Sequence, residues 1–237
     1  MASSLVLPRH TNIYGSVVDD PALFISPTFT VEVFATHEVA APLSDEDFYW
    51  VHKDGQWRIG FRTEEATGDF RVIYSIYYAN GSYTRNFVQA IPLCAWHHFA
   101  LCISPSGADD LAEIFMDGNR IDSQIISSTF GALVDSTGNH YLGIMNAAIG
   151  GLSFPWFGRV NGLRLSDSQR YSGAIYTVPS YPFVNDGNTK GLWLCNEGTG
   201  TTLADLSGNG NNITINGAAL WADEYPGEPC PGFIDVT

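Results

Sequence analysis

Oxygen-bearing side chains alternate along Asp205-Leu-Ser207-Gly-Asn209-Gly-Asn211. Calcium takes carboxylate, hydroxyl and amide oxygens as ligands, and the two glycines allow the tight path on which such side chains converge. The spacing therefore predicts a calcium site formed by Asp205, Ser207 and Asn209. A second interpretation stays open, because the position that would close a longer calcium loop holds Asn216 instead of glutamate. In that interpretation the side chains form Asx-type turns with their own backbone.

Exposed aromatic rings are the second candidate for ligand binding, because sugar rings and protein anchors pack against them. Trp156 lies in the sequence Gly-Gly-Leu-Ser-Phe-Pro-Trp-Phe, which is typical of an exposed loop, and Tyr83 lies beside the Asn80-Gly81 turn. We expect Trp156 and Tyr83 to contact a ligand. Trp193 and Trp221 occupy apolar strand positions and are expected in the core.

Catalytic patterns are weak. Glu113-Ile-Phe-Met-Asp117 is the nearest match to a glycosidase carboxylate pair, which in retaining enzymes lies roughly 5 Å apart on one face. The spacing is unsuitable, no third acid follows, and Asp117-Gly118 reads as a hairpin turn. His97 and His98 point to opposite faces of a predicted strand, so they do not share a metal. The sequence therefore predicts a non-enzymatic protein.

The elements that must position these residues are short strands, because apolar residues recur with period two in many windows. In 29–34, for example, Phe29, Val31 and Val33 face one side and Thr30, Glu32 and Phe34 the other. The predicted strands are Phe29–Phe34, Phe48–Val51, Trp57–Arg62, Phe70–Tyr78, Ser82–Val88, His97–Ser104, Ala112–Met116, His140–Ile144, Gly158–Leu165 and Gly191–Asn196.

Turn chemistry separates these strands. Asp54-Gly55, Asn80-Gly81 and Asp117-Gly118 each predict a tight hairpin. Ser166–Tyr171 begins with two capping residues and is expected to form a helical turn. Ten or more strands imply an all-β, two-sheet antiparallel sandwich of the jelly-roll type.

The composition agrees with that fold class. The chain has 237 residues, of which 45% are hydrophobic, and contains 24 glycines and 12 prolines, as expected for many strands joined by tight turns. No linker separates two cores, so we expect one domain over residues 1–223. Residues 224–237 are rich in proline and glycine and are expected to form a tail that cannot enter a sheet interior.

Charge excludes several partners. The chain carries 11 Lys and Arg against 25 Asp and Glu, a net charge of −14. Binding to nucleic acid requires clustered cations, and none occur, so neither nucleic acid nor an anionic membrane is an expected partner. Residues 1–9 lack a basic region and an uninterrupted apolar stretch, so we expect synthesis in a cytoplasm without a signal peptide. The four cysteines show no paired spacing and are expected to be mostly buried free thiols.

Three segments resemble the laminin-G-like, concanavalin-A-like lectin and glucanase superfamily. They are Trp96–Cys102 with Ala112–Gly118, Phe157–Ser166 with Arg170-Tyr171, and Leu192–Gly200 with Asp205–Asn211 and Gly217–Trp221. The resemblance implies the jelly-roll fold. It does not imply one function, since lectins, hydrolases, receptor modules and viral structural proteins share this fold.

The order of the segments is unusual for the family. In many single-domain relatives the Asp-x-Ser-Gly-Asn-Gly segment opens the domain, whereas here it follows the Gly158–Leu165 strand. The resemblance therefore implies a circularly permuted arrangement, in which residues 190–221 complete the sheet that residues 5–35 begin. The same order resembles domains of bacteriophage tail-fibre and virion surface proteins.

These observations lead to three hypotheses. The first is a structural or adhesive protein of the virion surface, a phage capsid decoration or tail-fibre component, whose partners are other virion proteins and further copies of itself. The alternative is a carbohydrate-binding lectin module that binds glycans through Asp205, Ser207, Asn209 and an aromatic loop, with calcium as its cofactor. The third is a glycoside hydrolase dependent on Glu113, for which we expect no turnover.

Overall fold

The computed structural model describes most of the chain. The described residues are 3–7, 13–23, 27–38, 46–64, 66–67, 69–147, 151–153, 158–223 and 226. Trp156 and almost all of the predicted tail at 224–237 lie outside them. Within these ranges the only helices are two single turns of 3₁₀ helix, η1 (Pro21–Leu23) and η2 (Ser128–Phe130). No helix in the described part of the chain is long and apolar enough to cross a membrane.

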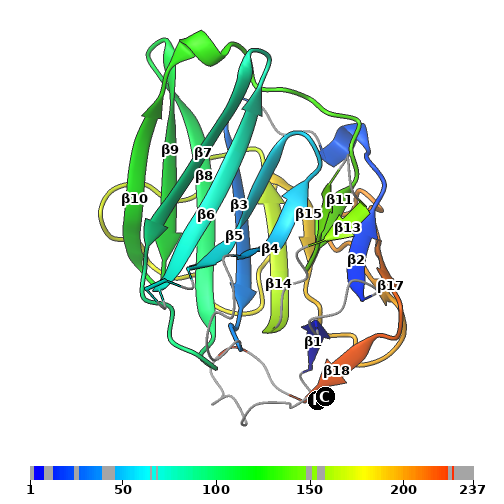
Figure 1. Ribbon diagram of the computed structural model, residues 1–237. Coiled ribbons are helices and arrows are strands. Elements are labelled where there is room, and N and C mark those ends of the chain that lie inside the picture. The colour runs from blue at the N-terminus through cyan, green and yellow to red at the C-terminus, as the bar shows by residue number, and fades with distance from the viewer. Residues whose placement is uncertain are drawn as a thin grey trace.

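Two antiparallel sheets form a sandwich, as the period-two pattern predicts (Figure 1). Sheet A has the order β10 (Asn119–Ile126), β9 (Asp109–Met116), β8 (His97–Ser106), β3 (Phe29–Ala35), β14 (Gly158–Ser166), β1 (Ser4–Leu7), β18 (Leu220–Ala222), with β15 (Thr189–Trp193) also paired to β14. Sheet B has the order β16 (Thr202–Leu203), β17 (Ile213–Asn216), β2 (Tyr14–Val17), β11 (His140–Leu142), β4 (Glu46–Lys53), β5 (Trp57–Glu64), β6 (Asp69–Tyr78), β7 (Gly81–Val88). A small hairpin joins β12 (Met145–Ala147) to β13 (Gly151–Ser153).

The three predicted hairpin turns are confirmed. Strands β4 and β5, β6 and β7, and β9 and β10 each pair directly across the short turn between them. Asp117 and Gly118 both have positive φ, 47° and 88°, the conformation that a two-residue hairpin of this twist requires. Asp117 is therefore a turn residue.

The C-terminal third returns to strands from the beginning of the chain, as the permuted order predicts. Strand β18 pairs with β1, where Leu5 lies opposite Trp221. Strand β17 pairs with β2, where Ile215 lies opposite Gly15. Residues 189–222 thus contribute strands to both sheets.

One hydrophobic core fills the space between the sheets. The inward-facing residues of β3, namely Phe29, Val31 and Val33, are fully buried in it. Trp193 from the C-terminal third belongs to the same cluster, and Trp50 stacks on Phe99 across the sandwich with ring centroids 4.0 Å apart. Trp221 is only partly buried and packs against the edge of this core.

The outer face of sheet A is covered by the segment from Asp167 to Asn188. This segment contains no helix, so the helical turn expected at Ser166–Tyr171 is wrong. Tyr171 of this segment instead reaches Glu32, which is fully buried and accepts hydrogen bonds from Tyr171 Oη (2.6 Å) and from Arg164 Nε of β14 (2.7 Å). The buried Glu32 carboxylate needs these partners, because an unpaired buried charge is costly. This requirement outweighs the tendency of Ser166 and Asp167 to cap a helix.

Candidate functional site

The Asp205 segment is tied to the backbone around it. Asp205 Oδ1 accepts hydrogen bonds from the amides of Leu192 (3.1 Å) and Ser207 (2.9 Å), and Oδ2 accepts one from the amide of Asn211 (2.9 Å). Both carboxylate oxygens are therefore used to brace the loop from within.

The other two residues predicted to bind calcium point to one carbonyl. Ser207 Oγ donates to the carbonyl oxygen of Lys190 (3.2 Å), and Asn209 Nδ2 donates to the same oxygen (2.8 Å). Among the described residues no three His, Cys, Asp or Glu side chains are placed to share a metal ion. The Asx-turn interpretation accounts for these contacts, while calcium binding stays a prediction.

Braced in this way, the loop forms one wall of a groove at the edge of sheet B. We call it the rim groove; its volume is about 350 Å³, within the size range of small-ligand sites. Its other wall comes from the end of β2 and the residues that follow it. The lining residues are Ser16, Val17, Val18, Asp19, Asp20, Gly210, Asn211, Asn212 and Thr214.

Asn211 is the buried polar residue among those that line the rim groove. Its backbone amide is held by Asp205, and its carbonyl oxygen accepts a hydrogen bond from Trp193 Nε1 (2.8 Å). The residue is only 8% exposed, and its side-chain Nδ2 has no hydrogen-bond partner among the described residues. A buried hydrogen-bond donor without a partner costs folding free energy, so a ligand that placed an acceptor against Asn211 Nδ2 would gain binding free energy.

The opposite wall of the rim groove carries two carboxylates of different character. Asp19 forms an ion pair with Lys53 Nζ at 2.9 Å, and this ammonium, whose side chain is fully buried, also lies 3.3 Å from Asp135. Asp20 instead accepts one hydrogen bond, from the amide of Ala22 (2.7 Å). The charge of Asp19 is compensated by a cation, whereas that of Asp20 is not compensated within the described residues.

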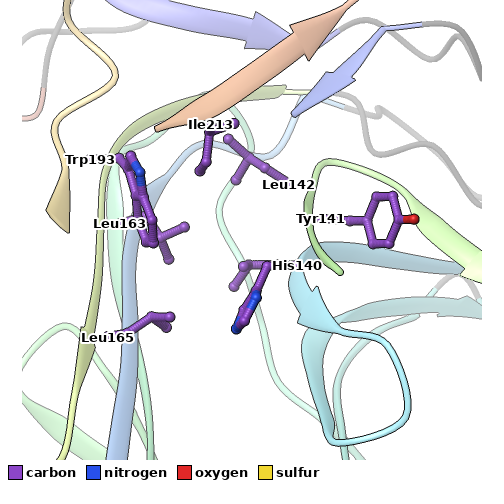
Figure 2. A pocket seen from close by; sticks show the side chains of 8 residues that line it. His140, Tyr141, Leu142, Leu163, Leu165, Trp193 and Ile213 are labelled. Atoms are coloured by element: carbon purple, nitrogen blue, oxygen red, sulfur yellow. The ribbon is translucent and has the colours of Figure 1, made fainter. Parts of the chain in front are cut away.

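Beneath the groove, side chains from the two sheets converge on a small internal cavity (Figure 2). Trp193, Leu163 and Leu165 of sheet A face Ile213, Leu142 and His140 of sheet B, while Tyr141 points away. The cavity measures about 10 Å³, room for the centre of one water molecule. It is too small for a sugar, so the rim groove outside is the site that can take a ligand.

Tyr83, predicted to contact a ligand, is placed in strand β7. It is half-buried, and its ring packs near Tyr74 and Phe130, each with a centroid distance of 6.3 Å. Strand β7 lies at the opposite edge of sheet B from β17. The structure therefore does not bring Tyr83 together with the Asp205 loop.

The carboxylates considered for catalysis have structural partners. Glu113 is buried and accepts hydrogen bonds from Arg120 and from Gln169 Nε2. Asp117 accepts a hydrogen bond from the backbone amide of His98 and contacts His97 Nδ1 at 2.6 Å. The two residues do not form a facing carboxylate pair.

The adjacent histidines do point to opposite faces. His98 Nε2 lies 3.0 Å from Glu32 on the outer side of sheet A, whereas His97 contacts Asp117 and the carbonyl oxygen of Pro92. Both therefore have hydrogen-bonded roles.

Two other surfaces of the described chain carry polar or charged side chains. A second groove, of about 360 Å³, lies near η2 and is lined by fewer polar side chains, namely Asp110, Ser127 and Ser128. On the outer face of sheet B, the Arg58 guanidinium carbon lies 5.2 Å from the Tyr49 ring centroid and 5.5 Å from that of Tyr77. The Arg58 guanidinium makes this surface cationic, so it is better suited to an anionic ligand than to a neutral one.

Sequence reasoning found one wall of the rim groove and missed the other. The alternating oxygen donors drew attention to 205–211, but Asp19 and Asp20 lie almost 200 positions earlier. The available signal in the sequence was the pair of adjacent acids that follows Val17-Val18. Only the pairing of β2 with β17 brings the two walls together.

Comparisons with known proteins place the fold. No protein-family model and no curated protein matches the chain. The structure is similar to that of a provisionally named carbohydrate-binding protein from Bacteroides ovatus, with 14% identity over 98% of this chain and 62% of that one and a TM-score of 0.65. The fold is a two-sheet antiparallel jelly-roll sandwich. The chain spans less than two thirds of the length of this neighbour.

Two further solved structures are similar at lower TM-scores. One is the CBM40 domain of the Ruminococcus gnavus IT-sialidase bound to α2,3-sialyllactose, with 12% identity, coverage of 71% of this chain and 91% of that one, and a TM-score of 0.49. The other is the LG4-5 segment of the mouse laminin α1 chain, with 13% identity, coverage of 70% and 42%, and a TM-score of 0.48.

Proposed function

We propose that this chain is a carbohydrate-binding module that holds a saccharide in the rim groove. The observation that carries the proposal is Asn211, a buried amide donor without a partner, fixed by Asp205 and Trp193 in a groove of suitable size. Sugar hydroxyls both donate and accept, so they match a lining of amides, carboxylates and hydroxyls. The name of the Bacteroides ovatus neighbour supports the same class of ligand.

A glycan array followed by calorimetry on the retained glycans tests the proposal. Asn211→Ala removes the side-chain donor but keeps both backbone anchors, and we expect affinity to fall about 2- to 10-fold, as for the loss of one neutral hydrogen bond. Ser128→Ala in the second groove is the matched control and should leave affinity unchanged. Retention of no glycan, or equal binding by Asn211→Ala, would refute the proposal.

The hypothesis of a role on a virus particle gains no support from the fold or from the comparisons, and it remains a prediction. The same is true of virion partners and self-association. The two roles are compatible, because an adhesive particle protein can itself bind glycans.

A further inference from the structure

The charges around the rim groove indicate which glycans it accepts. This inference rests on the proposed function and concerns the same site. Among the described residues that line the groove, the charged side chains are Asp19 and Asp20, and none is a lysine or arginine. A ligand at this site therefore meets negative potential and hydrogen-bond acceptors on one wall.

The two carboxylates differ in what they offer to a ligand. Asp19 is already paired with the buried Lys53 ammonium at 2.9 Å, so its charge is largely balanced. Asp20 accepts a hydrogen bond from the Ala22 amide, lines the groove, and forms no ion pair within the described part of the chain. A cationic group near Asp20 would gain a favourable pairing, and an anionic group would be repelled.

Hydrogen-bonding capacity points in the same direction. Asn211 Nδ2 needs one acceptor, which any sugar hydroxyl supplies. The carboxylates on the facing wall only accept when ionised, so they need donors from the ligand. A saccharide that carries an ammonium group supplies both an acceptor, from its hydroxyls, and donors for the carboxylates. A carboxylate or sulfate substituent would instead place hydrogen-bond acceptors against the acceptor oxygens of Asp19 and Asp20.

From this arrangement we infer that the rim groove selects amino sugars with a free ammonium group over their neutral counterparts, and rejects acidic sugars, with Asp20 as the residue that sets this preference. Because the groove is open to solvent, the pairing is of the surface type, and the expected preference for the amine is about 2- to 5-fold. Raising the ionic strength should reduce it.

The test compares glycans that share a backbone and differ in one substituent. The array carries hydroxyl, N-acetylamino, free amino and carboxylate forms of each backbone, and calorimetry then measures the matched set on the backbone that binds. Asp20→Asn should abolish the preference for the amine, so that the amine and hydroxyl forms bind this variant with equal affinity. Asp135→Asn is a charge-matched control, because Asp135 also lies near Lys53 but does not line the groove, and it should keep the preference.

Each outcome is informative. Preferred binding of the amine that is lost in Asp20→Asn and kept in Asp135→Asn supports the inference. Equal binding of amine and hydroxyl forms, preferred binding of the acidic form, or an unchanged preference in Asp20→Asn overturns it while leaving the carbohydrate-binding function intact. Absence of binding to every glycan overturns the proposed function, and this inference with it.

Discussion

Mild acid should unfold this protein, because three buried histidines cannot accept protons in the folded state. His37 lies between the Phe61 and Phe70 rings at centroid distances of 4.2 and 4.5 Å, and burial followed by the nearby His97 lowers its pKa to about 3. Burial and then Arg58 lower the pKa of His52 to about 3. Burial and then Lys53 lower that of His140 to about 3.

The sign and size of the effect follow from these pKa values. Between about pH 6.5, where the unfolded chain titrates, and the folded value near 3, the unfolded state binds more protons, so stability falls as pH falls. A pH of about 5 lies roughly 1.5 units below the pKa of a histidine in the unfolded chain, so at that pH each buried histidine lowers the unfolding free energy by roughly 2 kcal/mol. The three together lose about 6 kcal/mol, comparable to the total stability of an ordinary domain, about 5–15 kcal/mol.

Urea unfolding followed by tryptophan fluorescence, at constant ionic strength and pH values from about 7.5 to 5, measures this loss. His37→Leu should reduce the loss over that range by about 2 kcal/mol. Phe70→Leu is the control, because it opens the same packing without removing a titratable group and should keep the full pH slope. Equal stability at both ends of the range, or an unchanged slope in His37→Leu, would refute the reasoning.

Three further predictions concern stability. Glu32→Gln should lower the unfolding free energy by about 3–5 kcal/mol, since it leaves Arg164 buried without its carboxylate. Tyr171→Phe should lower it by about 1 kcal/mol, as for one lost hydrogen bond. A smaller loss for Glu32→Gln than for Tyr171→Phe in urea titrations would be inconsistent with this. Gly60→Ala should cost more than about 3 kcal/mol, because its Cβ would overlap the Phe48 carbonyl at a β-bulge; a thermal melt close to that of the wild type would contradict it. Asp205→Ala should lower stability by about 2–3 kcal/mol, because its carboxylate accepts three hydrogen bonds from backbone amides. In the wild type, a calcium-dependent rise in melting temperature would favour the metal interpretation, and an unchanged melting temperature would favour the Asx-turn interpretation.

The strands and hairpins were predictable because they depend on local chemistry. Period-two burial placed Glu32 on the face opposite Val31, and that assignment is confirmed. Strand β10 escaped notice because it is an edge strand whose outward positions are polar, so its alternation is weak. The helical turn at Ser166–Tyr171 was wrong because its side chains bind a carboxylate more than 130 positions away.

The candidate site was only half predictable, for a related physical reason. The Asp205 loop is visible as a motif because its hydrogen bonds are mostly local. To predict the facing wall, one must know which early strand pairs with β17. A four-residue strand such as β2 carries little information about its pairing register. The register of β2 against β17 depends instead on close packing between the strands, since a Cβ on Gly15 would lie 2.8 Å from the Ile213 side chain.

Ligand binding and folding should be coupled at this site, because the rim groove exists only when β2 and β17 are paired. Its walls follow β2 near the start of the sequence and precede β17 near the end, and Trp193 Nε1 links Asn211 directly to the core. Partial opening of the C-terminal third would remove one wall and expose that core together. A saccharide should therefore stabilise the whole fold, by about 2.7 kcal/mol when its concentration is a hundred times its dissociation constant. A saccharide that binds without raising the global unfolding temperature would place the site elsewhere on the molecule.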